Sequence, residues 1–95
     1  AAIVGLQERL RTAPDDAEAL GSLGLAYVQQ ARTTADPSYY PKAESVLTHS
    51  LSVQPGDNAT ATAGMAALAA ARHDFAAALD WAQKAVAQLD QITIG

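Results

Sequence analysis

Two histidines are the residues of this chain best suited to acid–base or metal chemistry. His73 stands between Arg72 and Asp74, and a carboxylate beside an imidazole is an arrangement that suits a general base. The sequence supplies no nucleophile for this trio, however, and a polar triplet between two helical segments is typical of a turn. We therefore interpret His73 as a turn residue.

The second histidine, His49, follows Glu44 by five residues. Two metal ligands on one face of a helix stand three or four residues apart, so this spacing does not favour a shared metal ion. Cysteine is absent, which excludes disulfides, thiolate ligands and a cysteine nucleophile. We accordingly predict no catalytic residues, no metal site and no cofactor, and hence a protein that is not an enzyme.

Three aromatic residues are the remaining candidates for ligand contact. Tyr39 and Tyr40 are adjacent, and Trp81 lies beside the apolar stripe of a predicted helix. We expect all three to pack within the fold. For Trp81 the alternative is contact with a partner, because tryptophan is enriched where proteins bind each other.

Composition narrows the class of protein further. The 95 residues correspond to one domain, and the many alanines among the 49% hydrophobic residues favour helix. The net charge is −4, and the six Lys and Arg residues are scattered, so we predict no nucleic-acid partner. The longest run of small apolar residues, 59–71, is too short for membrane insertion. The compartment stays open, with the cytoplasm favoured.

The elements that would position these residues are helices. Apolar spacing, prolines and polar turns predict five of them: at about 2–12, at about 15–32, from near Ser38 or Tyr39 to near Val53, at about 58–71 and at about 75–89. Asp15 and Glu18 have the spacing of a capping box at the start of the second helix. On the fifth helix we expect these residues to face inward: Phe75, Ala78, Leu79, Ala82, Val86 and Leu89.

One spacing pattern recurs along the chain. Its fullest copy reads Leu20-x2-Leu23-Gly24-x2-Tyr27, then Tyr40-x2-Ala43-x3-Leu47-x7-Pro55, and its end-piece recurs from Ala2 and from Ala78. The pattern resembles the tetratricopeptide repeat, a helix–turn–helix unit of about 34 residues. In this reading Gly24 and Ala43 are small because two helices cross closely there.

The resemblance implies an all-α domain over 1–95, in which antiparallel helix-turn-helix repeats stack as a short right-handed α-solenoid. Residues 1–13 would form a cap or half-repeat, 15–55 repeat one, 57–90 repeat two, and 91–95 a tail where a further repeat would begin. Repeat one carries about seven extra residues near 32–38. This insertion either lengthens the helices or forms a projecting loop.

In the family that the chain resembles, the first helix of each repeat lines a groove that holds a partner. Transferred position by position, the groove residues are Glu18, Gly21, Leu25, Val28, Thr60, Ala63, Ala67 and Ala70. They lack the Lys, Asn and Arg with which some members hold chaperone C-terminal carboxylates. The resemblance thus implies a module or scaffold that binds a peptide or helix of another protein, whose identity the sequence leaves open.

Two other functions remain as alternatives. Solenoids usually need about three repeats and polar end caps, so the open ends of this chain favour a self-assembling homo-oligomer. The chain also begins at Ala1-Ala2 without Met, as a piece of a longer protein would. It is then interpreted as a helical regulatory or accessory domain of a larger enzyme.

Overall fold

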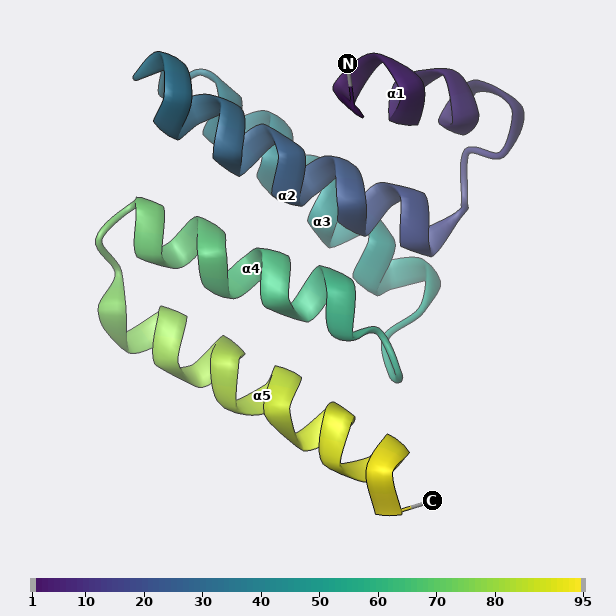
Figure 1. Cartoon of the computed structure of the whole chain (residues 1–95), viewed down its shortest axis with the longest axis vertical. Coiled ribbons are helices and arrows are strands. Elements are labelled where there is room, and N and C mark those ends of the chain that lie inside the picture. Colours follow the sequence, from purple (N-terminus) through teal and green to yellow (C-terminus); the bar gives the residue numbers. More distant parts are fainter. Residues whose placement is uncertain (1, 95) are drawn as a thin grey trace.

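The computed structural model describes residues 2–94, with side chains described as far as Leu89. Over that range the chain forms five helices and no strand (Figure 1). They are α1 (Ala2–Thr12), α2 (Ala17–Thr34), α3 (Tyr39–Val53), α4 (Ala59–Ala71) and α5 (Phe75–Ile94). The predicted all-α class with five helices is confirmed.

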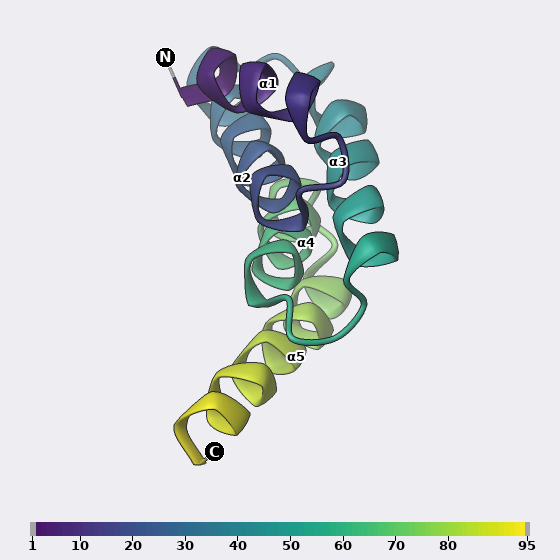
Figure 2. The ribbon, with the colours of Figure 1, turned by 90° about the vertical axis from the view of Figure 1, so that its right-hand side faces the viewer.

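Helices that follow each other in sequence pack against each other, and α2 also packs against α4. Figure 1 shows α4 between α2 and α5, with α1 beside α2 at the far side of the molecule. Figure 2 shows that α3 covers one side of the α2–α4 pair. The helix α2 is therefore the centre of the fold, because it contacts α1, α3 and α4.

Leu47 of α3 fills the space between α2 and α4, where it is fully buried. A Cβ atom added to Gly24 of α2 would lie 2.3 Å from Leu47 Cγ. A Cβ atom added to Gly64 of α4 would lie 2.5 Å from Leu47 Cδ2. Both distances are far shorter than a van der Waals contact, so only glycine leaves room for this leucine at the two positions.

A buried polar cluster connects four of the helices. Ser50 Oγ on α3 donates to the Ala17 carbonyl at 2.7 Å and accepts from Asn58 Nδ2 at 3.0 Å. Gln88 on α5 accepts from the Asn58 backbone N–H at 2.6 Å and donates to Thr62 Oγ1 at 3.0 Å. Among the described residues no buried side-chain nitrogen or oxygen lacks a partner, so the cluster is fully satisfied.

Side-chain caps begin the two helices at the centre of the fold. The N-cap of α2 is Asp16 and not the predicted Asp15: Asp16 Oδ1 accepts from the Ala19 N–H. Asn58 Oδ1 accepts from the Ala61 N–H at the start of α4. The helix α2 ends at Thr34 and is followed by its C-cap Ala35, whose φ of 55° lies in the left-handed region. These local signals explain why the predicted boundaries hold closely.

The inserted residues lengthen α2 and do not form a projecting loop. The helix α2 has 18 residues, whereas its counterpart α4 has 13. Only residues 35–38 separate α2 from α3. In that turn the Ser38 hydroxyl and backbone N–H lower the pKa of Asp36, because both stabilise its ionised carboxylate.

The helix α5 differs from the prediction in two respects. It continues to Ile94, so residues 91–94 of the expected tail are helical. The predicted inward orientation of its large apolar side chains is also wrong. Their exposed fractions are 66% for Phe75, 60% for Leu79, 57% for Val86 and 53% for Leu89. The reason is that α4 is the helix against which α5 packs, and the partly buried residues Trp81 and Ala85 lie on a different face.

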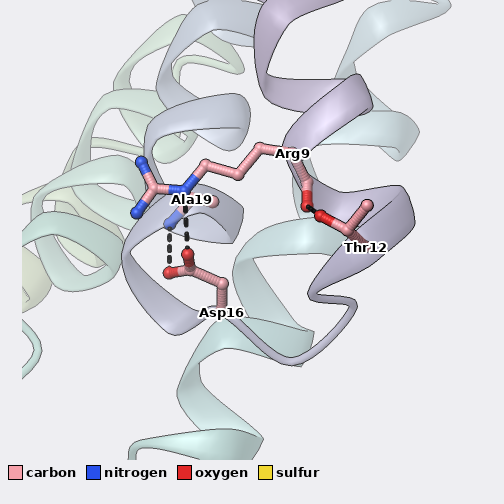
Figure 3. A network of polar contacts seen from close by, with 4 residues as sticks. All are labelled: Arg9, Thr12, Asp16 and Ala19. Carbon is pink, nitrogen blue, oxygen red and sulfur yellow. Dashed lines mark hydrogen bonds and ion pairs between the residues drawn. The ribbon is translucent and has the colours of Figure 1, made fainter.

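The first helix is connected to the start of α2 by a small polar network (Figure 3). Arg9 Nε donates to Asp16 Oδ2 at 2.9 Å, and the same carboxylate accepts from the Ala19 N–H at 3.1 Å. The hydrogen bond from the Ala19 N–H, and to a lesser degree the charge of Arg9, lowers the pKa of Asp16 below its ordinary value of 3.8. The network therefore depends on an ionised Asp16.

We predict an acid-dependent loss of stability that originates at Asp16. A carboxyl group whose pKa is lower in the folded state stabilises the protein above its unfolded pKa. That contribution disappears as the pH falls through the lower, folded-state pKa, so the effect lies below the ordinary value of 3.8. In Asp16→Asn, which keeps a cap acceptor, chemical unfolding followed by circular dichroism from neutral to acidic pH should show a shallower decline. Arg9→Gln should remove only the smaller part of this acid-dependent loss of stability. An unchanged decline in Asp16→Asn would contradict the assignment to Asp16.

We also predict strong coupling between Gly24 and Leu47. Gly24→Ala should lower the free energy of unfolding by about 1–3 kcal/mol through overpacking, and Leu47→Ala by about 2–5 kcal/mol through loss of buried volume. The double variant should lose less than the sum, because the shorter side chain removes the clash. Urea unfolding measures all three. Gly5→Ala is the control: an added Cβ there meets nothing within 4 Å, so we expect a gain of about 0.5–1 kcal/mol. Additive losses would contradict the close fit.

Candidate partner-binding surface

The predicted groove residues lie on two helices that are adjacent in space, α2 and α4. At one end, Thr60 Oγ1 on α4 donates to the Glu18 carboxylate on α2, with oxygen–oxygen distances of 3.1 and 3.2 Å. Glu18 is exposed and Thr60 is half-buried. Side chains that are 42 residues apart in sequence therefore meet at the surface of the molecule.

Two of the predicted residues lie inside the fold. Gly21 lies close against α4, since an added Cβ would lie 3.1 Å from Thr60 Cγ2 and 3.2 Å from the Ala61 nitrogen. Val28 is only 2% exposed and belongs to the hydrophobic core. Neither residue offers an exposed side chain to a partner, because α2 is covered on three sides by α1, α3 and α4.

The other end of the surface is hollowed. Leu25 and Ala67, which are both half-buried, line a hollow of about 490 Å³ together with Val28 at its floor. Ala63 is exposed on α4, and Ala70 is half-buried one turn beyond Ala67. Ala63, Ala67 and Ala70 thus follow one face of α4 at helical spacing, and Leu25 of α2 lies beside Ala67.

Polar residues at the end of α2 complete this hollow and were not among the predicted groove residues. Gln29, Arg32 and Thr33 line it beside Leu25. Arg32 and Thr33 lie in the last part of α2, by which this helix of 18 residues exceeds the 13 residues of α4, and Gln29 lies just before it. The insertion was visible in the sequence, but its contribution to the surface follows only from its helical conformation. The surface therefore carries a carboxylate at one end and a guanidinium at the other.

His73 has a structural role in the turn between α4 and α5. The backbone N–H of His73 donates to the Ala70 carbonyl at 3.0 Å, and the backbone N–H of Asp74 donates to the Ala69 carbonyl at 2.8 Å. This pair of hydrogen bonds is a Schellman ending of α4, and it places His73 at φ 61°, a region that favours glycine. The interpretation of His73 as a turn residue is thereby confirmed.

The other candidates for chemistry have neighbours within the fold. His49 Nε2 lies 2.9 Å from an Asp15 carboxylate oxygen. Tyr39 packs against the Tyr27 ring at a centroid distance of 6.0 Å. Trp81 of α5 is partly buried on the side of α5 that faces α4. In the described part of the chain, no group of three or more His, Asp or Glu residues is arranged to hold a metal ion.

Comparison of the chain with protein-family models, with curated proteins and with solved structures finds no match. Within residues 2–94 no helix combines the length and apolar character that crossing a bilayer requires. The assignment of α2 and α4 as a candidate binding surface is therefore based on the geometry of these two helices alone.

We predict that His73→Gly stabilises the protein. A residue with a Cβ atom has a steric cost of about 1–2 kcal/mol in the left-handed region, which glycine avoids. Because glycine also loses more backbone entropy on folding, we expect a net gain of about 0.5–1 kcal/mol in the free energy of unfolding. Thermal unfolding measures it. His73→Ala, which keeps the Cβ atom and removes the imidazole, is the control and should show no such gain. A loss of stability in His73→Gly would show that the imidazole itself matters.

Proposed function

We propose that this chain is a non-catalytic protein-interaction module of the tetratricopeptide type. In this proposal α2–α3 and α4–α5 are two repeats of a short right-handed solenoid, and α1 is a preceding half-repeat. The position of Gly24 supports it, because the glycine lies against Leu47 at the crossing where the resemblance requires a small residue. The order in which the helices pack also supports it.

The observation that carries the proposal is the meeting of equivalent positions from the two first helices. Glu18 and Thr60 are joined by hydrogen bonds, and Leu25 and Ala67 line one hollow. Glu18 has the same position in α2 as Thr60 has in α4, and Leu25 has the same position in α2 as Ala67 has in α4. A continuous surface built from equivalent positions is what a groove of stacked repeats requires.

The chemistry of this surface favours a helix as its occupant. Small side chains such as Ala63 and Ala67 let another helix approach closely. Glu18 and Arg32 are 14 residues apart on α2, which corresponds to about 21 Å along a helix axis. A partner helix of about four turns fits this length, with a basic residue near Glu18, an acidic residue near Arg32 and apolar residues between them.

The size of the apolar contact sets the strength of this binding. Burying Leu25 fully contributes roughly 1.5–3 kcal/mol. Association itself costs about 4–15 kcal/mol, so this one side chain does not hold a partner. Recognition then depends on the two charged ends together with the whole length of the α2–α4 surface. We therefore expect modest affinity and a strong dependence on partner charge and orientation.

Selection of helical peptides tests the proposal. A displayed library of helix-forming peptides is selected on the wild-type chain, and each binder is titrated by fluorescence anisotropy against wild type and Leu25→Glu. Placing a carboxylate in the hollow should weaken binding by at least about tenfold, because the charge is desolvated against an apolar partner face. Arg32→Glu should weaken peptides that have an acidic end and favour peptides with a basic residue there.

Val53→Glu is the matched control, because Val53 is an exposed valine on α3, outside this surface. It should bind as wild type does. Equal affinity of wild type and Leu25→Glu for every selected peptide would remove the α2–α4 surface from the proposal.

A further inference from the structure

Among the described residues, most of the large apolar side chains that are exposed lie in a row along α5. Phe75, Leu79 and Val86 are each more than half exposed, and Ala82 lies exposed between them. Their spacing of four, three and four residues keeps them on one face of the helix. Figure 1 shows α5 at the edge of the molecule, beside α4. The row is therefore open to a further protein surface.

Internal similarity identifies what this row corresponds to. Tyr40, Glu44 and Leu47 of α3 contact α4 or the residue that follows it: Leu47 contacts Gly64, and Arg72, directly after α4, contacts both Glu44 and the Tyr40 ring. In the recurring spacing pattern, their equivalents on α5 are Phe75, Leu79 and Ala82. The exposed residues on α5 thus occupy the positions that, on α3, face α4 and the residue after it.

The row differs from its α3 counterpart in a way that favours self-association. The charged Glu44 is replaced by Leu79, and the wedge-forming Leu47 is replaced by Ala82. One projecting leucine and one recessed alanine then stand three residues apart on one face. If a second copy is placed antiparallel, each Leu79 fits over the Ala82 of the other copy, and each Phe75 lies opposite the other Val86.

We propose that the exposed face of α5 binds the same face of a second copy of this chain, as an antiparallel twofold pair. Among the described side chains of α5, none on the row is charged, so no described charge on it opposes this pairing. Asp80 and Lys84 form an ion pair at 3.2 Å, and Lys84 lies over the Trp81 ring, away from the row. A face without charge can meet itself in a chain whose net charge is −4, where most other surfaces would repel their own copy.

The area of the row sets the expected strength. Three large side chains that are more than half exposed, with the small residues between them, offer on the order of 500 Å² per copy, which is below the roughly 800 Å² of a standard interface. The dimer is therefore weak and forms with a dissociation constant on the order of 10–100 μM.

Sedimentation equilibrium of the 95-residue chain, from about 10 μM to about 1 mM, tests this range of affinity. Wild type should shift from monomer to dimer. Leu79→Lys and Val86→Lys should each stay monomeric across the range while their circular dichroism matches wild type, since both sites are solvent-exposed. Val4→Lys, at an exposed valine on α1, is the matched control and should still dimerise.

Cross-linking tests the pairing itself, and the chain suits it because it contains no cysteine. A mixture of Leu79→Cys and Ala82→Cys chains should form a disulfide dimer faster under mild oxidation than either variant alone. A parallel pair would instead join Leu79→Cys chains to one another. Faster joining of like variants overturns the antiparallel register.

Three results would overturn the proposal as a whole. A wild-type chain that is monomeric at every concentration leaves the row to another occupant, either a following helix of a longer chain or a different protein. A dimer that persists in both Leu79→Lys and Val86→Lys places the interface elsewhere. Higher oligomers that grow with concentration indicate end-to-end stacking rather than a closed pair.

Discussion

The fit of Leu47 between Gly24 and Gly64 is the constraint on which the rest of the structure depends. One leucine side chain touches two other helices at positions where no Cβ atom is tolerated. It therefore sets the separation of α2 and α4, the two helices that form the candidate binding surface. The contact between Gly21 and Thr60 on that surface requires the same separation. A packing detail of the core thus determines whether two sets of surface residues meet.

The polar cluster around Asn58 adds a second constraint at one end of these helices. Asn58 caps α4, donates through Nδ2 to Ser50 Oγ of α3 and donates through its backbone N–H to Gln88 Oε1 of α5. Hydrogen bonds among buried groups are costly to leave unmade, so this end of the molecule has one favoured arrangement. The opposite end, where α2 extends past α4, carries the hollow beside Arg32. Rigidity at one end and an open contour at the other suit a surface that receives a partner lengthwise.

Local spacing was sufficient to predict the helices and the crossing of Gly24 with Leu47, since caps, prolines and small residues act over a few positions. The burial of Val28 was not predictable, because it depends on three helices packing around α2 at once. Gly64 was missed since it lies two residues before Ala66, the position that the repeat pattern marks as small. Polar residues such as Ser50 and Gln88 leave no periodic signal, so their cluster emerges only from the fold.

The first and the last helix of the molecule differ in their contacts and in the exposure of their apolar side chains. At the first end, α1 packs against α2 and is held by Arg9 on Asp16 and by Gln7, which donates to the Tyr27 hydroxyl at 3.0 Å. These contacts hold α1 against α2. At the last end, α5 has α4 on one face and leaves Leu79 and Val86 in solvent. Exposed apolar rows of this kind mark interaction sites, which is the physical ground for the association proposed for this face of α5.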